Sequence, residues 1–331
     1  MKSPGTLLLR RREVAQLLSL DDCIVAVEEA FRLRGEGRAP SSGTLSTHFP
    51  GGGFHIKTSM DPTHAYFAAK LNGNFPANPE RFGLPTIQGV IMLCDADNGS
   101  PLAVMDSIEI TILRTGAATG VAAKRMARAN STVVTICGCG NQGRVQLQAV
   151  TRVLPIQRAY AFDRDGRAAE SFAREMSSAL EMEVTPAADV GEAVRDSDVC
   201  VTCTPSEVFF VRRDMVKTGT FIAAVGADNP YKQEIEPELL ASARLVLDDA
   251  QQCASMGELH HAIERGLKAR ENPEDAELAE VVAGKKPGRT GDDEITIFDS
   301  TGVALEDVAA AVMVYERALS AGAGHRVELA A

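Results

Sequence analysis

The sequence TVVTICGCGNQGRVQLQAVTRVLPIQRAYAFD, residues 132–163, decides the fold of this chain. Its apolar run at residues 133–137 is typical of a strand buried on both faces of a sheet. A turn follows, and residues 144–153 are predicted to form a helix. The turn holds three glycines in G-x-G-x-x-G spacing: Gly138, Gly140 and Gly143. Such glycines allow a tight turn, the approach of a pyrophosphate to bare backbone, and close packing of helix on strand.

An acid at the end of the next strand completes the pattern. Residues 158–162 are predicted to form that strand, and Asp163 follows about 20 residues beyond the last glycine. The glycine spacing alone is a weak signal in a chain with 28 glycines. Strand, turn, helix, strand and acid in this order nevertheless predict a dinucleotide-binding unit. Asp163 favours NAD(H), because a carboxylate repels the 2′-phosphate of NADP(H), while the neighbouring Arg164 leaves NADP(H) open.

Length and composition indicate the class of protein. The chain has 331 residues, enough for two domains, and no apolar run approaches the ~20 residues of a membrane span. The N-terminal sequence MKSPGTLLLRRREV lacks the apolar core of a signal peptide, so we expect a cytoplasmic protein. A net charge of −11 argues against a nucleic-acid-binding surface. Neither nucleic acid nor a membrane is therefore expected as a partner.

The cysteines and histidines predict no metal site. Seven scattered cysteines suit a reducing compartment. Cys200 and Cys203 have C-x-x-C spacing, but an odd offset in a predicted strand sends the two side chains to opposite faces. His260 and His261 lack partners at ligand spacing, and we interpret them as an ordinary pair on a surface helix.

The first part of the chain is predicted to differ from the nucleotide-binding part. A helical region at residues 12–33 precedes β segments separated by turns, at residues 44–49, 53–60, 66–71, 85–93 and 102–106. Lys57 and Lys70 lie on either side of an Asp-Pro turn, so a hairpin would bring both ammonium groups to one cavity. A lysine within an apolar strand is costly unless it meets an anion or solvent. The alternative is that both lysines keep a sheet edge soluble.

The segment at residues 108–127 is predicted to contain a helix that starts after Thr111 and binds an anion near its start. We expect Thr111 to be the N-cap, which would place Arg114 and Thr115 in the first turn. A guanidinium there opposes the helix dipole unless an anion joins both, and a carboxylate held bidentately would do so. Small residues from Gly116 onward indicate that another element packs very close. The alternative for Arg114 is a structural salt bridge between domains.

The chain after the glycine turn alternates predicted strands and helices. Two buried strands, residues 198–204 and 220–226, end near Thr204 and Asp228. In a parallel sheet, ligands gather at the carboxyl ends of strands. Asp228 is therefore the best-placed carboxylate to meet a substrate, unless it is the N-cap of a helix from Pro230 onward.

The sequence resembles the ornithine cyclodeaminase/μ-crystallin family, whose members include alanine dehydrogenases and ketimine reductases. The matching segments run in order nearly from end to end: KLNGNFP at residues 70–76, GLPTIQG at 83–89, LRTGAA at 113–118, CGCGNQG at 137–143, TCTPS at 202–206, VGADNPYKQE at 225–234 and FDSTGVALED at 298–307. The resemblance implies a homodimer built through the first domain, a Rossmann second domain and NAD(P)-dependent chemistry.

We therefore expect an α/β protein of two domains. A mixed α/β domain for substrate binding and dimerisation comprises residues 1–127 plus 303–331, and a doubly wound parallel sheet of Rossmann type comprises residues 128–302. The closing helix, residues 303–319, should return to the first domain and leave the cofactor in the cleft between the two.

Carried over position by position, the resemblance also implies roles for single residues. Lys70 and Arg114 would contact the substrate carboxylate and the reacting centre, with Asp228 beside the reacting nitrogen. Besides the three glycines, the following residues would line the cofactor: Thr86, Arg114, Thr115, Asn141, Gln142, Asp163, Arg164, Thr204, Val225, Gly226, Ala227, Asp228, Lys232 and Ser300.

Two departures from the cyclodeaminases bear on the substrate. Where they carry an arginine soon after a proline, Pro40 is followed here by Ser41 and Ser42. Thirteen residues before the lysine that matches Lys70, they have a glutamate that receives the distal ammonium of ornithine, and this chain has Lys57. A buried lysine would repel that ammonium by several kcal/mol. The charge swap argues against ornithine and for a substrate recognised by its carboxylate, as in the family's alanine dehydrogenases.

We predict an NAD(P)-dependent oxidoreductase that transfers hydride reversibly between nicotinamide and the Cα of a small imino or 2-oxo acid. Candidates are a cyclic ketimine such as pyrroline-2-carboxylate, or pyruvate plus ammonia. Lys57 and Arg114 would hold the carboxylate, Lys70 would polarise the C=O or C=N bond or transfer a proton, and Asp228 would stabilise the iminium or ammonium. The alternatives are a cyclodeaminase of another amino acid that recycles bound NAD, and a non-catalytic binder of nucleotide or small ligand.

Overall fold

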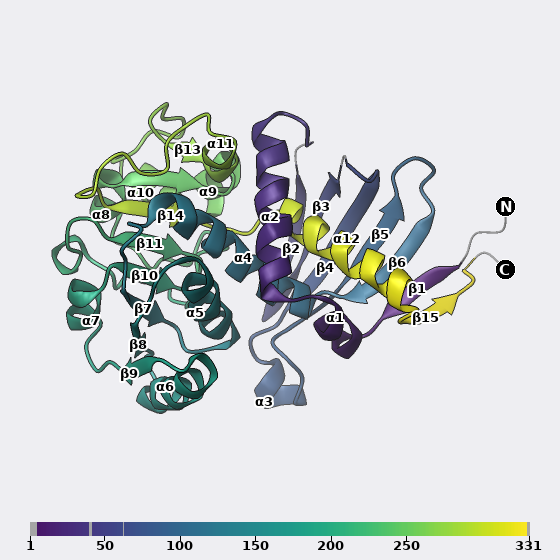
Figure 1. The fold of residues 1–331 in the computed structure, drawn as a ribbon, viewed down its shortest axis with the longest axis horizontal. Coiled ribbons are helices and arrows are strands. Elements are labelled where there is room, and N and C mark those ends of the chain that lie inside the picture. The colour runs from purple at the N-terminus through teal and green to yellow at the C-terminus, as the bar shows by residue number, and fades with distance from the viewer. Residues whose placement is uncertain (1–4, 40–41, 62, 330–331) are drawn as a thin grey trace. The chain divides into compact units, whose positions relative to one another are not determined.

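The computed structural model describes residues 5–39, 42–61 and 63–329. The chain forms two compact units, drawn in Figure 1. Unit 1 comprises the described residues within 1–114 and 303–331, and unit 2 comprises residues 115–302. Among the described residues, every helix is too short or too polar to span a membrane.

Unit 1 is built on a seven-stranded sheet with the order β15-β1-β6-β5-β4-β3-β2. Neighbouring strands are antiparallel, except that β1 and β6 are parallel. The strands are β1 (Thr6–Leu9), β2 (Gly43–Phe49), β3 (Gly52–Asp61), β4 (Tyr66–Asn74), β5 (Ile87–Asp95), β6 (Pro101–Asp106) and β15 (His325–Val327). The five β segments predicted between residues 44 and 106 are thus confirmed as β2 to β6, and the mixed sheet follows from them.

A long helix covers one face of this sheet. The closing helix α12 (Ala304–Ala321) packs against β3, β4 and β5, and α2 (Leu20–Gly35) packs against α12. Figure 1 shows α12 running across the sheet. This helix has an apolar stripe, and Leu305, Val308, Val312 and Tyr315 on it are buried. The other helices of this part of the chain are α1 (Arg11–Leu17), α3 (Asn78–Phe82) and the start of α4 (Ile108–Met126).

The opposite face of the sheet exposes apolar side chains. Strand residues alternate between faces, so Ile91 on β5 is buried toward α12 while its neighbours Val90 and Met92 point the other way. Val90 is 42% exposed, Met92 41% and Leu71 on β4 40%. This open face, with Leu8 and Leu45 at 38% and 62% exposure, is an apolar surface of the isolated chain.

Unit 2 holds an eight-stranded parallel sheet with the order β13-β12-β14-β11-β10-β7-β8-β9. Its strands are β7 (Val133–Cys137), β8 (Arg158–Phe162), β9 (Glu183–Pro186), β10 (Val199–Thr202), β11 (Phe221–Ala224), β12 (Arg244–Leu247), β13 (Ala276–Glu277) and β14 (Thr296–Asp299). From β7 the chain adds β8 and β9 on one side and then β10 and β11 on the other, and the last strand, β14, lies between β11 and β12. This order confirms the predicted doubly wound sheet of Rossmann type.

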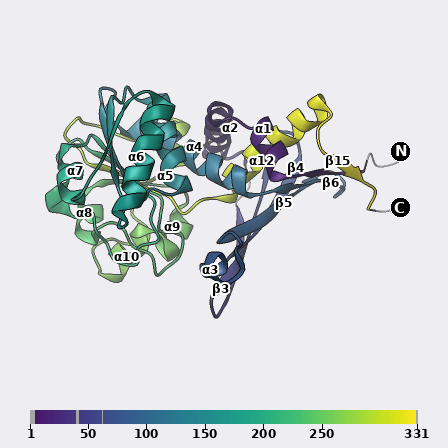
Figure 2. The same ribbon diagram turned by 90° about the horizontal axis from the view of Figure 1, so that it is seen from below.

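Short helices connect the strands of unit 2. Figure 2 shows α5 (Asn141–Val153) and α6 (Gly166–Leu180) side by side, and they pack against β7, β8 and β9. The remaining helices are α7 (Val190–Asp196), the 3-10 helix η1 (Arg213–Met215), α8 (Pro237–Ser242), α9 (Ala250–Met256), α10 (Glu258–Glu264) and α11 (Leu278–Val282). No helix starts at Pro230, so the alternative interpretation of Asp228 as an N-cap is wrong.

The predicted start of α4 is also wrong. The helix begins at Ile108, because the Asp106 carboxylate accepts a hydrogen bond from the Ile108 amide at 3.0 Å. The Thr111 amide already donates to the Ser107 carbonyl at 2.8 Å, as inside a helix. Arg114 therefore lies beyond the first turn, and its anion-binding role cannot rest on the N-terminus of α4.

The small residues of α4 do allow close packing, as predicted. A Cβ on Gly116 would lie 2.7 Å from Val145 Cγ2 and 3.1 Å from the Val145 carbonyl oxygen. Since both distances are shorter than ordinary contact, α4 packs directly on the backbone of α5. This contact holds α5, the helix that follows the glycine turn, against α4.

Candidate functional site

The two predicted lysines face the same side of the sheet in unit 1. Strands β3 and β4 pair antiparallel, and the register sets Lys57 directly opposite Lys70. The Lys70 residue is only 4% exposed. The hairpin predicted from the sequence is thereby confirmed, and both lysines point toward α12. Their contact with a substrate stays a prediction.

Two carboxylates at the start of α12 meet these cations. Lys70 Nζ lies 2.6 Å from Asp307 Oδ2, and Arg114 Nε lies 3.1 Å from Asp307 Oδ1. Arg114 Nη1 lies 2.6 Å from Glu306 Oε2, and the Glu306 side chain is completely buried. The N-terminus of a helix favours negative charge, so the first turn of α12 is a suitable place for both acids. We name Lys57, Lys70, Arg114, Glu306 and Asp307 the charge cluster.

Burial controls protonation in the charge cluster. It is the main reason why the pKa of Lys70 falls to about 7; Arg114 and Lys57 lower that pKa as well, and Asp307 opposes the fall. Burial alone would raise the pKa of Asp307, but Lys70 and Arg114 outweigh it, and this pKa lies below its ordinary value. Asp307 therefore stays ionised, while Lys70 can gain or lose a proton near neutral pH.

The glycine turn of unit 2 leaves open space at the start of α5. Gly138 has a φ of +105°, and a Cβ there would lie 2.9 Å from the Cys203 carbonyl oxygen. A Cβ on Gly143 would lie 2.1 Å from the Gly138 carbonyl oxygen, whereas one on Gly140 would meet nothing within 4 Å. The first turn of α5, with Asn141 and Gln142, contains no acid. The geometry fits a pyrophosphate against the backbone beside Gly140.

Asp163 supports this turn from the end of β8. Its Oδ2 accepts a hydrogen bond from the Cys139 amide at 2.9 Å, and its Oδ1 accepts one from the Asp165 amide at 3.0 Å. Asp163 is half-buried and the neighbouring Arg164 is exposed. The carboxylate thus has a structural role at the predicted cofactor edge, and its contact with a ribose stays a prediction.

Glu234 joins the turns that follow β10 and β11. Its Oε1 accepts hydrogen bonds from the Thr204 amide and hydroxyl, both at 2.6 Å, and its Oε2 accepts one from the Gly226 amide at 3.0 Å. Burial raises the pKa of Glu234. A Cβ on Gly226 would lie 2.4 Å from the Glu234 carboxylate, so this position requires glycine. Glu234 was not among the predicted site residues, although it closes the segment VGADNPYKQE.

The other predicted cofactor residues of unit 2 lie at the same edge of the sheet. The Ser300 amide donates to the Ala224 carbonyl at 2.9 Å, which sets the end of β14 beside that of β11. Val225 and Ala227 lie between that strand end and Asp228. Lys232 Nζ lies 2.8 Å from Asp228 Oδ1, and the Asp228 side chain is 49% exposed. The strand order places these residues and Thr204 beside the glycine turn, at the carboxyl edge of neighbouring strands.

The structure thus gathers the predicted residues into two groups. The charge cluster holds the substrate candidates of unit 1, and the carboxyl edge of unit 2 holds most of the cofactor candidates. Thr86 lies in unit 1 just before β5, where its carbonyl accepts a hydrogen bond from the Phe75 amide at 2.8 Å. Thr115 is a buried residue of α4. The proline loop that departs from the cyclodeaminases, at residues 40–41, lies outside the described residues.

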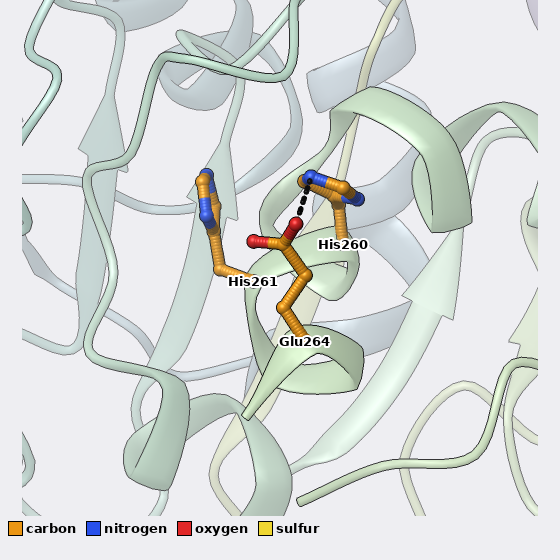
Figure 3. Close-up of side chains that lie close together, drawn as sticks. All are labelled: His260, His261 and Glu264. Carbon is orange, nitrogen blue, oxygen red and sulfur yellow. Dashed lines mark ion pairs between the residues drawn. The ribbon is translucent and has the colours of Figure 1, made fainter. Parts of the chain in front are cut away.

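The histidines on α10 have an acidic neighbour that the sequence analysis overlooked. Figure 3 shows His260, His261 and Glu264, whose ligand atoms lie within 4.8 Å of one another. His260 Nε2 lies 3.4 Å from Glu264 Oε1. The prediction that the histidines lack partners at ligand spacing is therefore wrong. His261 Nε2, however, contacts the Lys232 carbonyl at 2.8 Å, which gives this ring a role in holding the loop after β11.

Glu306 and Asp307 are the further functional candidates that the sequence analysis missed. Both stand at the end of the segment FDSTGVALED, which matches the family. In the sequence they could have been recognised as two adjacent acids in the otherwise apolar first turn of a helix. That signal is ambiguous, because acids in a first turn usually face solvent and only complement the helix dipole.

The sequence matches the model of the ornithine cyclodeaminase/mu-crystallin family over residues 5–322. Among curated relatives, an alanine dehydrogenase of Archaeoglobus fulgidus is 41% identical over 98% of this chain and 98% of its own length. A Delta(1)-pyrroline-2-carboxylate reductase of Bacillus cereus is 35% identical over 75% of this chain and 77% of its own.

Solved structures also resemble this chain over nearly its full length. An archaeal alanine dehydrogenase dimer with bound NAD is 41% identical, with a TM-score of 0.94 over 98% of this chain and 99% of that one. Thermococcus litoralis Delta(1)-pyrroline-2-carboxylate reductase in complex with NADH and L-proline is 34% identical, with a TM-score of 0.92 over 97% and 100%. A lysine cyclodeaminase is 31% identical, with a TM-score of 0.85 over 98% and 96%.

Proposed function

The chain belongs to the ornithine cyclodeaminase/mu-crystallin family, and on this basis we propose that it is an NAD(H)-dependent oxidoreductase acting at the Cα of a small imino or 2-oxo acid. The relatives named above include an alanine dehydrogenase and a pyrroline-2-carboxylate reductase. Alanine and proline share a carboxylate next to the carbon that bears nitrogen. A site for this common part is what the charge cluster supports.

The observation that carries the proposal is the concentration of cations in the charge cluster. Lys57, Lys70 and Arg114 lie together beside Glu306 and Asp307, so an entering carboxylate would meet three cationic side chains. A second ammonium on the substrate would instead meet Lys57. Two like charges about 4 Å apart repel by about 4 kcal/mol at an effective dielectric of about 20. The cluster thus favours a substrate that carries no second, distal ammonium.

The carboxyl edge of unit 2 fits NAD(H). The open space beside Gly140 would take the pyrophosphate, Asp163 the adenosine ribose, and the turns at Thr204 and Asp228 the nicotinamide end. Two related structures hold NAD or NADH. Asp163 also disfavours a 2′-phosphate, although the exposed Arg164 keeps NADP(H) as the weaker alternative. When bound, the nicotinamide supplies or accepts the hydride. Further contacts are proposed from Thr86, Thr115, Asn141, Gln142, Val225, Gly226, Ala227, Lys232 and Ser300.

The residues of the chain have separate roles in this proposal. Arg114 and Lys57 bind the carboxylate and so orient Cα. Lys70 donates a proton to the reduced nitrogen or oxygen, or accepts it in the reverse direction, for which a pKa of about 7 is suitable. Asp228 stabilises positive charge on the nitrogen. Because Asp228 already pairs with Lys232 at 2.8 Å, an iminium would replace one cation beside it by another.

A cofactor-absorbance assay tests the proposal. We expect net oxidation of NADH with pyruvate plus ammonia, with pyrroline-2-carboxylate, or with another member of a panel of imino and 2-oxo acids. Ammonia release from an amino acid without net change in NADH would instead support a cyclodeaminase, the alternative that the lysine cyclodeaminase relative favours. Binding of NADH without turnover on any member of the panel would support a non-catalytic binder.

We also propose that a second copy of the chain covers the open face of the sheet in unit 1. Exposed apolar residues at Leu71, Val90 and Met92 suit an interface, and the archaeal relative is a dimer. Replacing Met92 with Lys should give a monomer by light scattering, whereas Val25→Lys on α2, where Val25 is 65% exposed, should leave the mass unchanged. A dimeric Met92→Lys variant would place the interface elsewhere.

A cytoplasmic location is part of the same proposal. All seven cysteines are free, which suits a compartment that keeps thiols reduced. Detection of the native protein in a cytoplasmic fraction would support this location, and detection outside that fraction would refute it.

A further inference from the structure

Asp307 contacts two of the three cations in the charge cluster. Its Oδ2 lies 2.6 Å from Lys70 Nζ, and its Oδ1 lies 3.1 Å from Arg114 Nε. Glu306 contacts the same guanidinium through Nη1 at 2.6 Å. The carboxylate of Asp307 therefore connects β4 and α4 through the first turn of α12.

We infer that Asp307 is a positioning residue of the proposed reaction: it fixes Lys70 and Arg114 relative to each other and keeps Lys70 protonated for proton donation. The inference rests on the proposed function, because that function assigns proton transfer to Lys70. In the reductive direction, the N–H bond of the Lys70 ammonium breaks and its proton goes to the substrate nitrogen or oxygen as hydride arrives at Cα. Glu306 is the corresponding positioning residue for Arg114.

The geometry suits such a role better than simple charge compensation. A lysine has four rotatable bonds, so a second contact is needed to hold its ammonium in one place. Asp307 is short, its residue is 2% exposed, and it stands on a helix whose stripe is packed against the sheet. Its two oxygens each lie within ion-pair distance of a different cation, and a shift of the carboxylate would change both contacts.

The charges around Lys70 determine the sign of the expected pH effect. They come from Lys57 on β3, Arg114 on α4, and Glu306 and Asp307 on α12, with the Cys23 thiol of α2 near the two acids. Burial, Arg114 and Lys57 lower the pKa of Lys70, and Asp307 raises it. Removal of the Asp307 charge should therefore lower this pKa further. Reduction needs protonated Lys70, so the loss of activity at high pH should begin at a lower pH.

The experiment compares pH profiles of kcat/KM for NADH-dependent reduction. The high-pH limb is the part of the profile in which kcat/KM falls as Lys70 loses its proton. In Asp307→Asn this limb should move to lower pH, and each pH unit of this shift lowers kcat/KM at high pH about tenfold. Glu306→Gln should raise KM for the acid and leave the limb in place. Asp307→Glu keeps the charge but displaces it by one methylene, so its limb should stay near that of the wild type while kcat falls. Glu36→Gln, which changes a surface partner of Arg32, is the matched control.

Each result decides the inference. A limb of Asp307→Asn that stays at the wild-type pH overturns it, even if the rate falls, because a merely structural acid would lower the rate at every pH. Should Asp307→Asn fail to fold by thermal unfolding, wild-type kcat in Asp307→Glu overturns it and reduced kcat with an unmoved limb supports it. A wild-type enzyme without turnover on any acid refutes the proposed function and this inference together, whereas wild-type turnover with an unmoved limb in Asp307→Asn refutes the inference alone.

Discussion

Two single-methyl substitutions in the glycine turn should separate cofactor binding from folding. A Cβ on Gly143 would lie 2.1 Å from the Gly138 carbonyl oxygen and 3.2 Å from Ile136 Cγ2. A Cβ on Gly140 would meet nothing within 4 Å, and its φ of −83° is accessible to alanine. Gly143→Ala must therefore displace backbone, whereas Gly140→Ala only fills the space proposed for the pyrophosphate.

The expected magnitudes follow from these distances. The Gly143→Ala contact is more than 1 Å shorter than an ordinary contact. Overpacking of this kind lowers the free energy of unfolding by about 1–3 kcal/mol, partly offset by about 1 kcal/mol because alanine favours a helix. Gly140→Ala should leave the free energy of unfolding within about 0.5 kcal/mol of the wild type. Its Kd for NADH should rise at least about tenfold, which corresponds to about 1.4 kcal/mol.

Urea unfolding followed by circular dichroism measures the stability, and fluorescence titration with NADH measures the Kd. Gly291→Ala is the matched control, because a Cβ there also meets nothing within 4 Å. It should keep both the stability and the affinity of the wild type. If Gly140→Ala folds normally and binds NADH with wild-type affinity, the pyrophosphate does not lie against this turn, and the proposed cofactor site is wrong.

Three further substitutions test the substrate residues, each measured by steady-state kinetics. Asp228→Asn should lower kcat by about 10²-fold with little change in KM, since it removes charge that stabilises the reacting nitrogen; a kcat near the wild-type value would exclude that role. Arg114→Lys should raise KM for the acid by about tenfold or more, because a bidentate contact is lost; an unchanged KM would show that the carboxylate binds elsewhere. Lys57→Glu exchanges a cation for an anion and should raise KM by about 10²- to 10³-fold; a wild-type KM would remove Lys57 from the site.

The sequence predicted those features whose signal is local and repeated. The glycine turn lies between a buried strand and a helix, so its context could be recognised without coordinates. The shared face of Lys57 and Lys70 followed from one assumption, a hairpin across the Asp-Pro turn, because side chains alternate along a strand. Both predictions needed only the periodicity of regular structure.

The start of α4 shows where local signals compete. Asp106 and Thr111 are both good N-cap residues, and the sequence does not state which carboxylate or hydroxyl meets an unpaired amide. The structure uses Asp106, so the helix begins one turn earlier than predicted. The short elements α3, β13 and β15 were missed for a related reason, since two to five residues carry no measurable periodicity.

The acids of the charge cluster could not be predicted because their role depends on tertiary packing. In the sequence, Glu306 and Asp307 are indistinguishable from first-turn acids that face solvent. Only the packing of α12 against β4 buries them and brings Lys70 and Arg114 within 2.6–3.1 Å. Glu234 is similar, because the two turns that it joins are 22 residues apart in the chain.

The buried carboxylates of the two units can be told apart by what neutralises them. In unit 2, Glu258 accepts from the Glu234 and Ile235 amides at 2.7 and 3.2 Å, and Asp299 accepts from the Glu258 and Leu259 amides at 3.1 and 2.9 Å. Burial raises the pKa of both acids, that of Asp299 to about 7. These acids accept hydrogen bonds from buried backbone amides that would otherwise have no partner, which is a structural role.

The charge cluster of unit 1 has a different arrangement. Its acids meet side-chain cations, and a buried ion pair is often no more stable than apolar residues of the same volume. Packing alone therefore gives little reason for placing Lys70 and Arg114 inside a sheet-and-helix core. A ligand that needs a desolvated carboxylate site gives that reason, because the attraction between charges is stronger where water is excluded. The proposed function follows from this difference: unit 2 uses buried charge to hold backbone, and unit 1 uses it to receive an anion.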